Sequence, residues 1–249
     1  MPEPRVRVYC EGPDDRAVIV ALQKGGVFPE RLEMAPPSGG EGNLAHDVAP
    51  FVSPELAGGR ALVLRDHDDL DVAGIGVWFE RALRAKLSPA VTLTATPVGV
   101  VRYTVCEATS GTRRGLVAVI PVGKPSALDL HSIYGVLRFA VDDYLLALAR
   151  EIDIYEALVK GEKEIEVGHM LAHKKLGEVL DLMRENGIPV TKSKRLMHLL
   201  RAIIGFRASP AVFAERLVSK AIQVRGANAV AALMQPLIGD ITHALGTVG

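Results

Sequence analysis

The stretch that decides the fold is Val6-Arg7-Val8-Tyr9-Cys10-Glu11-Gly12-Pro13, where a segment rich in β-forming residues stops at a glutamate, a glycine and a proline. Alternation over residues 6–10 predicts a β-strand. Pro13 suits the first position of a helix, and the two acids that follow it complement the positive end of the helix dipole. The stretch therefore predicts a strand that leads directly into a helix, with Glu11 at the turn between them.

A second stretch, residues 61–64, has the wholly apolar sequence of a strand buried in a parallel sheet, and it runs into Arg65-Asp66-His67-Asp68. Further strands are expected over residues 31–35, 98–105 and 116–120, and further helices over residues 43–51 and 76–87. Strands that alternate with helices in this way predict an α/β fold with a parallel sheet flanked by helices, over residues 1–125.

The second half of the chain has a different pattern. Apolar residues recur with helical spacing over residues 133–158, 169–185, 194–204, 210–224 and 227–245. Ser209 and Pro210 supply a helix cap and a first-turn proline. Residues 126–249 are therefore expected to form a mainly helical domain or a helical cap on the sheet.

The composition narrows the class of protein. The 249 residues are 49% hydrophobic, which is enough to bury a core, and 29 basic residues balance 29 acidic ones. Two cysteines are too few for a disulfide framework or a CxxC zinc site. The N-terminus lacks the apolar segment of a signal peptide, and no apolar run approaches the length of about 20 residues that spans a bilayer. We therefore expect a soluble, cytoplasmic protein without a membrane partner.

Three carboxylates follow the two strands described first. Glu11 comes directly after residues 6–10, and Asp66 and Asp68 come after residues 61–64. Ligands of open parallel sheets bind at the carboxyl ends of the strands, so these acids are expected to converge if the two strands are neighbours. Clustered carboxylates repel one another unless a cation intervenes, and oxygen ligands favour Mg²⁺ or Mn²⁺. The pattern predicts a metal site that polarises a phosphoryl oxygen.

Residues 8–15 and 62–68 resemble the two acidic motifs of the TOPRIM superfamily, which are a strand ending in Glu-Gly and a strand ending in Asp-x-Asp. The likeness covers roughly residues 5–122. Within the superfamily, the chain is most similar to overcoming-lysogenization-defect-type nucleases and related small TOPRIM proteins. The resemblance implies a compact TOPRIM-like parallel sheet, bound Mg²⁺, and cleavage or joining of phosphodiester bonds.

The resemblance also implies roles for individual residues. Glu11, Asp66 and Asp68 would be the catalytic metal ligands, and Asp15 would be a further ligand. Asp142 is another candidate ligand, because Asp142-Asp143-Tyr144 is similar to a Glu-Asp/Asn-Tyr segment of those nucleases with Asp in place of Glu. The chain has no Gly-x-x-x-x-Gly-Lys-Ser/Thr motif for binding ATP. Any nuclease activity is therefore expected to be independent of ATP, unless ATP acts through a partner protein.

Basic residues gather late in the sequence. Residues 186–230 hold eight lysines and arginines against one acid. Such a stretch can bind phosphates, and it is equally typical of a solvated helix face. The candidates for binding substrate are Lys124, Lys174, Lys194, Arg195 and Arg201. Because aromatic residues make up only 5% of the chain, a base-stacking platform for single strands is not indicated.

The leading hypothesis is a nuclease or related phosphodiester-transfer enzyme that depends on Mg²⁺ or Mn²⁺ and acts on DNA or RNA. The alternative is a non-catalytic module that keeps the fold and binds nucleic acid or a protein. A third hypothesis is phosphoryl transfer to a small molecule. The sequence leaves open the choice between DNA and RNA, the cleavage pattern, the pathway and whether the chain forms a homo-oligomer.

Overall fold

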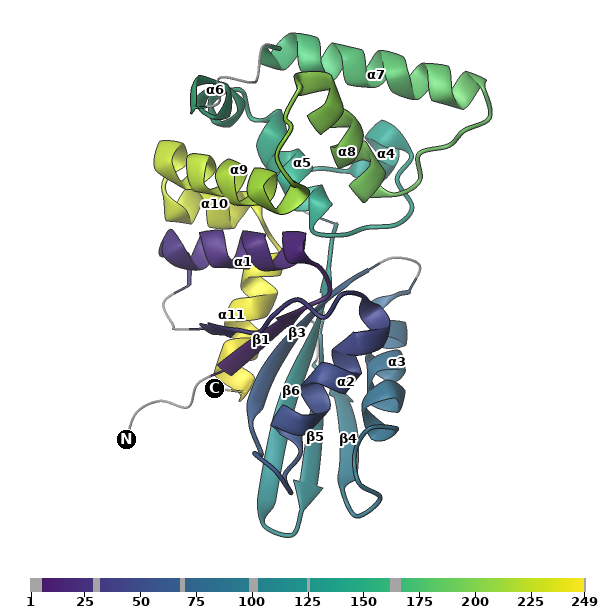
Figure 1. Cartoon of the computed structure of the whole chain (residues 1–249), viewed down its shortest axis with the longest axis vertical. Helices are drawn as coiled ribbons and strands as arrows, with labels where there is room; N and C mark the ends of the chain where they lie inside the picture. Colours follow the sequence, from purple (N-terminus) through teal and green to yellow (C-terminus); the bar gives the residue numbers. More distant parts are fainter. Residues whose placement is uncertain are drawn as a thin grey trace. The chain divides into compact units, whose positions relative to one another are not determined.

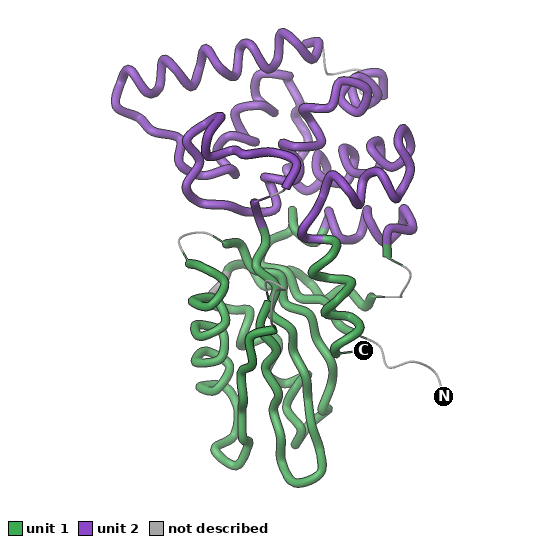
Figure 2. Tube along the Cα trace, turned by 180° about the vertical axis from the view of Figure 1, so that it is seen from behind, with its two compact units in different colours: residues 1–16, 28–122, 238–249 green, residues 17–27, 123–237 purple. Residues whose placement is uncertain are grey.

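The computed structural model (Figure 1) describes residues 6–28, 32–67, 70–98, 103–124, 126–161 and 167–248. The chain divides into two compact units (Figure 2). The sheet unit comprises Met1–Arg16, Phe28–Val122 and Ile238–Gly249, and the helical unit comprises Ala17–Val27 and Gly123–Leu237. The sequence-based division at residue 125 falls close to the passage from Val122 to Gly123, whereas residues 17–27 and 238–249 belong to the other unit from the one expected.

The sheet unit is built on a mixed sheet. Its strands β1 (Val6–Cys10), β2 (Leu32–Met34), β3 (Arg60–Asp66), β4 (Thr92–Pro97), β5 (Thr104–Ser110) and β6 (Arg113–Val122) form, within the described residues, a six-stranded sheet in the order β2-β1-β3-β6-β5-β4. The pairings among β2, β1, β3 and β6 are parallel, whereas β5 pairs antiparallel with both β6 and β4. The expected α/β fold is confirmed, and the expected parallel sheet is found in part, because the pairings of β5 are antiparallel.

A single strand was expected over residues 98–105, but the structure has two antiparallel strands, β4 before this segment and β5 from Thr104 onward. Residues 99–102 lie outside the described residues. Strand β4 is an edge strand, and most of its side chains are exposed. Strand β5 begins at Thr104 and buries Cys106 and Ala108 on alternate positions. An edge strand with a solvated face has no continuous apolar run, which explains why the sequence pattern missed β4.

Helices cover both faces of the sheet. Helices α2 (Glu41–Val52) and α3 (Val72–Arg84) pack on one face over a buried apolar core, and α11 (Leu237–Val248) lies on the other face (Figures 1 and 2). The hydroxyl of the buried Tyr103 lies 2.5 Å from Nδ1 of His243 and 2.9 Å from Oγ1 of Thr247, which ties α11 to the sheet.

A close approach determines how α2 meets β6. A Cβ atom on Gly115 would lie 1.8 Å from the carbonyl oxygen of Val52 at the end of α2. A side chain of any size is therefore excluded at this position, and glycine allows the strand and the helix to come into contact. This contact helps to place α2 over the sheet.

In the helical unit, α5 (Asp142–Arg150) is the central helix. Its residues from Asp142 to Ala149 are all buried, and α6 (Ile152–Gly161), α8 (Ser193–Ile204) and α9 (Pro210–Arg225) pack against it. Helix α7 (His169–Glu185) packs on α6 and α8. The unit also contains α4 (Leu130–Tyr134), α10 (Ala227–Leu233) and most of α1 (Pro13–Lys24).

Helices α7, α8 and α9 confirm the sequence-based expectations closely, and Ser209 caps α9 by accepting a hydrogen bond of 3.3 Å from the Val212 amide. The helix expected over residues 133–158 is wrong, because the chain falls into α4, α5 and α6 there and Gly135 ends α4 in the left-handed region at φ 73°. Similarly, α10 stops before Pro236, which has no amide hydrogen to continue the helix. Within the part of the chain that the structure describes, every helix is too short or too polar to cross a membrane.

Candidate functional site

The site begins with the pairing of β1 and β3. Cys10, the last residue of β1, lies opposite Leu64 in a parallel register. Glu11 follows Cys10 directly, and Asp66 is the last residue of β3. Since the carboxyl ends of parallel strands meet at the same edge, the structure brings these two acids to one edge of the sheet. Asp68 lies outside the described residues.

Asp15 lies close to this edge, in the first turn of α1. Its carboxylate accepts a hydrogen bond of 2.8 Å from the Gly12 amide, and only 6% of the residue is exposed. Burial raises the pKa of the Cys10 thiol well above its usual range, and the charges of Asp15 and Asp66 raise it further against the opposing charge of Arg16. Asp15 on α1 and Asp66 on β3 both influence the charge of the same thiol, so both carboxylates lie near Cys10.

The backbone around Glu11 is held by the loop that follows β2. The amide of Ser38 donates to the carbonyl of Cys10 at 3.1 Å, and the amide of Gly40 donates to the carbonyl of Glu11 at 3.2 Å. The side chain of Asn43 closes the loop by donating to the Ser38 carbonyl at 3.0 Å. The loop therefore extends the sheet ladder beyond the end of β1. Sequence reasoning missed this role, although the two consecutive glycines before α2 are a signal for such a turn.

The donor set at this edge fits a hard divalent ion in its chemistry. One carboxylate oxygen of Glu11 and one of Asp66 are buried, as are the side chains of Asp14 and Asp15. Buried carboxylates are costly unless positive charge or hydrogen bonds compensate them. Among the described residues, however, no three acids, histidines or cysteines are arranged as a metal-binding group. A complete ligand set would therefore need a further residue.

The Asp142-Asp143 pair belongs to the helical unit, and both residues are buried. Asp143 accepts hydrogen bonds of 3.1 Å from the amides of Lys124 and Ala140. Burial raises the pKa of Asp143 to about 7, against the effect of these hydrogen bonds. Asp143 thus anchors the chain that leads into α5, which is a structural role. Asp142 is a candidate ligand from the TOPRIM resemblance alone.

Lys124 occupies an unusual backbone conformation. Its φ angle is 56°, in the left-handed region that non-glycine residues rarely adopt. The Nζ atom lies 4.8 Å from the ring centroid of Phe139, and the neighbouring Gly123 carbonyl accepts a hydrogen bond of 2.8 Å from the Tyr144 hydroxyl. The buried start of α5 therefore holds this lysine in place, while its side chain stays exposed.

Arg201 serves the internal structure of the helical unit. It donates a hydrogen bond to the carbonyl of Ala208, and its guanidinium carbon lies 6.0 and 5.8 Å from the ring centroids of Phe206 and Phe213. These contacts fasten the loop between α8 and α9. The basic stretch predicts a phosphate ligand at Arg201, but that pattern does not distinguish a solvated arginine from one packed on aromatic rings.

Other basic candidates are exposed. Lys194 and Arg195 lie in the first turn of α8 and face solvent, and Lys174 on α7 makes an exposed ion pair of 3.7 Å with Glu178. Arg225, in contrast, is bound by carboxylates: Nη2 lies 2.6 Å from both Glu151 and Asp153, in a partly buried cluster. The basic stretch therefore contains residues with different roles.

Comparison with family models, with curated proteins and with solved structures found no match for this chain. The resemblance to the TOPRIM superfamily rests on residues 8–15 and 62–68 themselves.

Proposed function

We propose that this protein is a Mg²⁺- or Mn²⁺-dependent nuclease, or a related phosphodiester-transfer enzyme, that acts on DNA or RNA. One observation carries the proposal: Cys10 pairs with Leu64 in adjacent parallel strands, so Glu11 and Asp66 stand at the same edge of the sheet. The TOPRIM resemblance of the segments that hold these acids favours the same chemistry. Asp68 completes the proposed ligand set on the basis of the sequence.

The acids have different roles in this proposal. Glu11, Asp66 and Asp68 offer carboxylate oxygens, and a divalent ion held by them would polarise a phosphoryl oxygen and activate a water molecule. Asp15 is oriented by its hydrogen bond from the Gly12 amide before any substrate arrives. Such preorganisation reduces the rearrangement that the transition state requires.

Substrate binding is proposed for exposed cations of the helical unit. Lys194 and Arg195 lie side by side in sequence at the start of α8, and both face solvent. Lys124 and Lys174 are also exposed. Contacts from such side chains to backbone phosphates are independent of base sequence, and they weaken as salt concentration rises.

The test is a cleavage assay with labelled single- and double-stranded DNA and RNA over a range of Mg²⁺ and Mn²⁺ concentrations. The wild-type protein is expected to cleave at least one substrate. Glu11→Gln and Asp66→Asn are expected to reduce the rate at least about 100-fold, because each removes a charged ligand while keeping the shape of the side chain. Circular dichroism and thermal unfolding establish that both variants are folded.

The matched control is Glu107→Gln, which neutralises a partly exposed carboxylate of β5 that pairs with Arg114 in the same unit. It should cleave at the wild-type rate. Full activity in Glu11→Gln or Asp66→Asn would contradict the proposal. A protein that cleaves nothing with either ion, yet binds nucleic acid and loses that affinity in Lys194→Gln and Arg195→Gln, is instead a binding module.

A further inference from the structure

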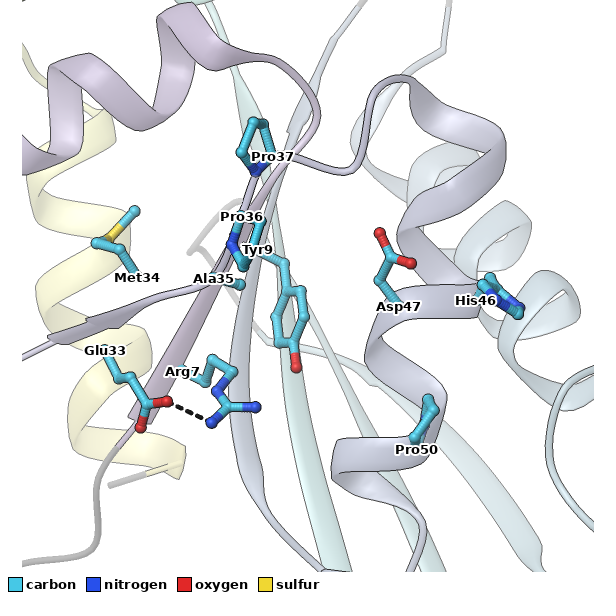
Figure 3. A pocket seen from close by; sticks show the side chains of 10 residues that line it. All are labelled: Arg7, Tyr9, Glu33, Met34, Ala35, Pro36, Pro37, His46, Asp47 and Pro50. Carbon is cyan, nitrogen blue, oxygen red and sulfur yellow. Dashed lines mark hydrogen bonds and ion pairs between the residues drawn. The ribbon is translucent and has the colours of Figure 1, made fainter.

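A cavity of about 550 Å³ opens in the sheet unit between helix α2 and the β1–β2 end of the sheet (Figure 3). Its polar lining comes from Arg7 and Tyr9 on β1, Glu33 on β2, and His46 and Asp47 on α2. A volume of this size lies within the range of about 300–1,000 Å³ that is usual for small-molecule sites. The cavity is therefore large enough to hold one planar ring with its substituents.

The floor of the cavity is polar and held in position. Arg7 donates a hydrogen bond to Glu33, and its guanidinium carbon lies 4.3 Å from the ring centroid of Phe51. The side chains of Arg7 and Glu33 remain 34% and 39% exposed, so a ligand can still reach their hydrogen-bonding atoms. Burial raises the pKa of the Tyr9 phenol, against the opposing effect of Arg7, and only 4% of this residue is exposed. The floor offers both donors and acceptors.

The walls of the cavity are apolar and flat. Pro36 and Pro37 line it from the loop after β2, and Pro50 lines it from α2. Figure 3 shows Asp47 and Pro50 on α2 on one side of the Tyr9 ring and the Arg7–Glu33 pair on its other side. Proline has no N–H group to donate, so these rings can contact the flat faces of a ligand. The polar groups of the floor can form hydrogen bonds with the edge of the ligand.

The charge of the lining limits what can enter. Glu33 and Asp47 carry two negative charges against the positive charge of Arg7, so the carboxylates of the lining disfavour a phosphate inside the cavity. The imidazole of His46 also lines the cavity and adds a polar group that can meet the edge of a ligand. A hydrocarbon would leave the polar floor without hydrogen bonds, which is also costly. A neutral planar ring with donors and acceptors on its edge satisfies both conditions.

We propose that this cavity binds one nucleobase of the nucleic-acid substrate, with the attached phosphate outside it. The choice of a nucleobase among neutral planar rings rests on the proposed function.

The position of the cavity suits this role, because two of its lining residues lead along the chain into the candidate site. Pro36 and Pro37 run directly into the loop whose Gly40 amide holds the Glu11 carbonyl. Glu11 lies two residues after Tyr9, just past the end of β1, and two residues of extended chain span about 7 Å. One nucleotide can span this distance with its base in the cavity and its phosphate toward the edge that bears Glu11.

The test uses isothermal titration calorimetry with the full chain in EDTA. The probes are the four nucleoside 5′-monophosphates, and ribose 5-phosphate provides a control without a base. At least one nucleotide is expected to bind about tenfold or more tightly than ribose 5-phosphate. Glu33→Gln and Asp47→Asn are expected to weaken that nucleotide at least about fivefold, because each removes a charged acceptor.

The matched control is Glu80→Gln, which neutralises a partly exposed carboxylate that pairs with Arg84 on α3, away from the cavity. It should bind nucleotides as the wild type does. Equal binding of ribose 5-phosphate and all four nucleotides would overturn the proposal, and so would unchanged affinity in both Glu33→Gln and Asp47→Asn with the fold intact.

The outcome is separable from that of the proposed nuclease function. Nucleotide binding is measured in EDTA, where the proposed metal-dependent cleavage does not occur, so the two properties are read in separate assays. Base-dependent binding that requires Glu33, in a protein without any cleavage activity, would support the cavity and reject the nuclease. Cleavage that requires Asp66, without base-dependent binding, would support the nuclease and reject the cavity.

Discussion

Cys10 lies opposite Leu64 across two parallel strands, and this pairing determines where the acids after both strands are placed. The register is maintained along β1, where Val8 pairs with Leu62. A slip by one residue would turn each side chain to the opposite face, where the packing that now buries both sides of β3 would no longer fit. Burial of the core therefore also controls the geometry of the site edge.

Replacing two glycines by alanine should change the free energy of unfolding in opposite directions, because Gly115 lies in a tight contact and Gly177 does not. Gly115→Ala places a methyl group 1.8 Å from the Val52 carbonyl oxygen, so we expect the free energy of unfolding to fall by about 3 kcal/mol or more. Gly177→Ala lies on α7 with nothing within 4 Å of the added carbon. It should raise the stability by about 0.5–1 kcal/mol through helix propensity. Urea unfolding measures both, and a stable Gly115→Ala variant would refute the close approach.

Tyr103→Phe should loosen α11. The change removes the hydroxyl that contacts His243 and Thr247, and we expect a loss of about 1–2 kcal/mol in the free energy of unfolding. Hydrogen exchange of the α11 amides should also become faster. Tyr134→Phe, which removes an exposed hydrogen bond from Arg150, is the control and should change stability by less than about 0.5 kcal/mol. Unchanged exchange in α11 would show that the Tyr103 hydroxyl does not hold this helix.

His173 should make the protein less stable at acid pH. Burial lowers its pKa from the ordinary value of 6.5, the charges of His169 and Arg150 lower it further, and its hydrogen bond to the Ala149 carbonyl opposes them. Between the pKa of His173 in the folded protein and its ordinary value of 6.5, this histidine binds a proton in the unfolded chain more readily than in the folded protein. Stability is therefore complete above about pH 6.5 and is lost as the pH falls through the folded pKa.

His173→Gln can still donate a hydrogen bond to Ala149 and has no titrating ring. We expect the variant to lose less stability than the wild type between pH 7 and pH 5, as measured by urea unfolding across that range. His198→Gln, at an exposed position of α8, serves as the control and should retain the wild-type pH dependence. The same pH dependence in wild type and His173→Gln would rule out this histidine as its source.

Arg195 and Arg225 should differ in nucleic-acid binding. Arg195 is exposed, whereas Arg225 is bound by Glu151 and Asp153. Under the proposed function, Arg195→Gln should weaken binding of a labelled oligonucleotide and reduce the salt dependence by about one counterion, as measured by fluorescence anisotropy. Arg225→Gln should leave affinity unchanged and lower stability by about 1 kcal/mol. Equal loss of affinity in both variants would contradict this division of roles.

The sequence by itself determined the elements whose signals are local. The alternation in β1, the apolar run in β3 and the periodic helices α7, α8 and α9 follow from residues that are neighbours in the chain. Ser209 and Pro210 likewise mark the start of α9, because capping involves only the first turn of a helix. The acids of the candidate site could be named for the same reason, since each follows a recognisable strand.

The tertiary structure decided which of these elements are neighbours. That β1 lies between β2 and β3, and that α11 packs with the sheet unit, could not be predicted from local patterns. Arg7 and Glu33 likewise come together in the cavity from separate strands, and Tyr103 meets His243 across 140 positions of the sequence. Periodicity reports which face of an element is buried, but the partner of that face depends on how all the apolar surfaces of a unit pack together.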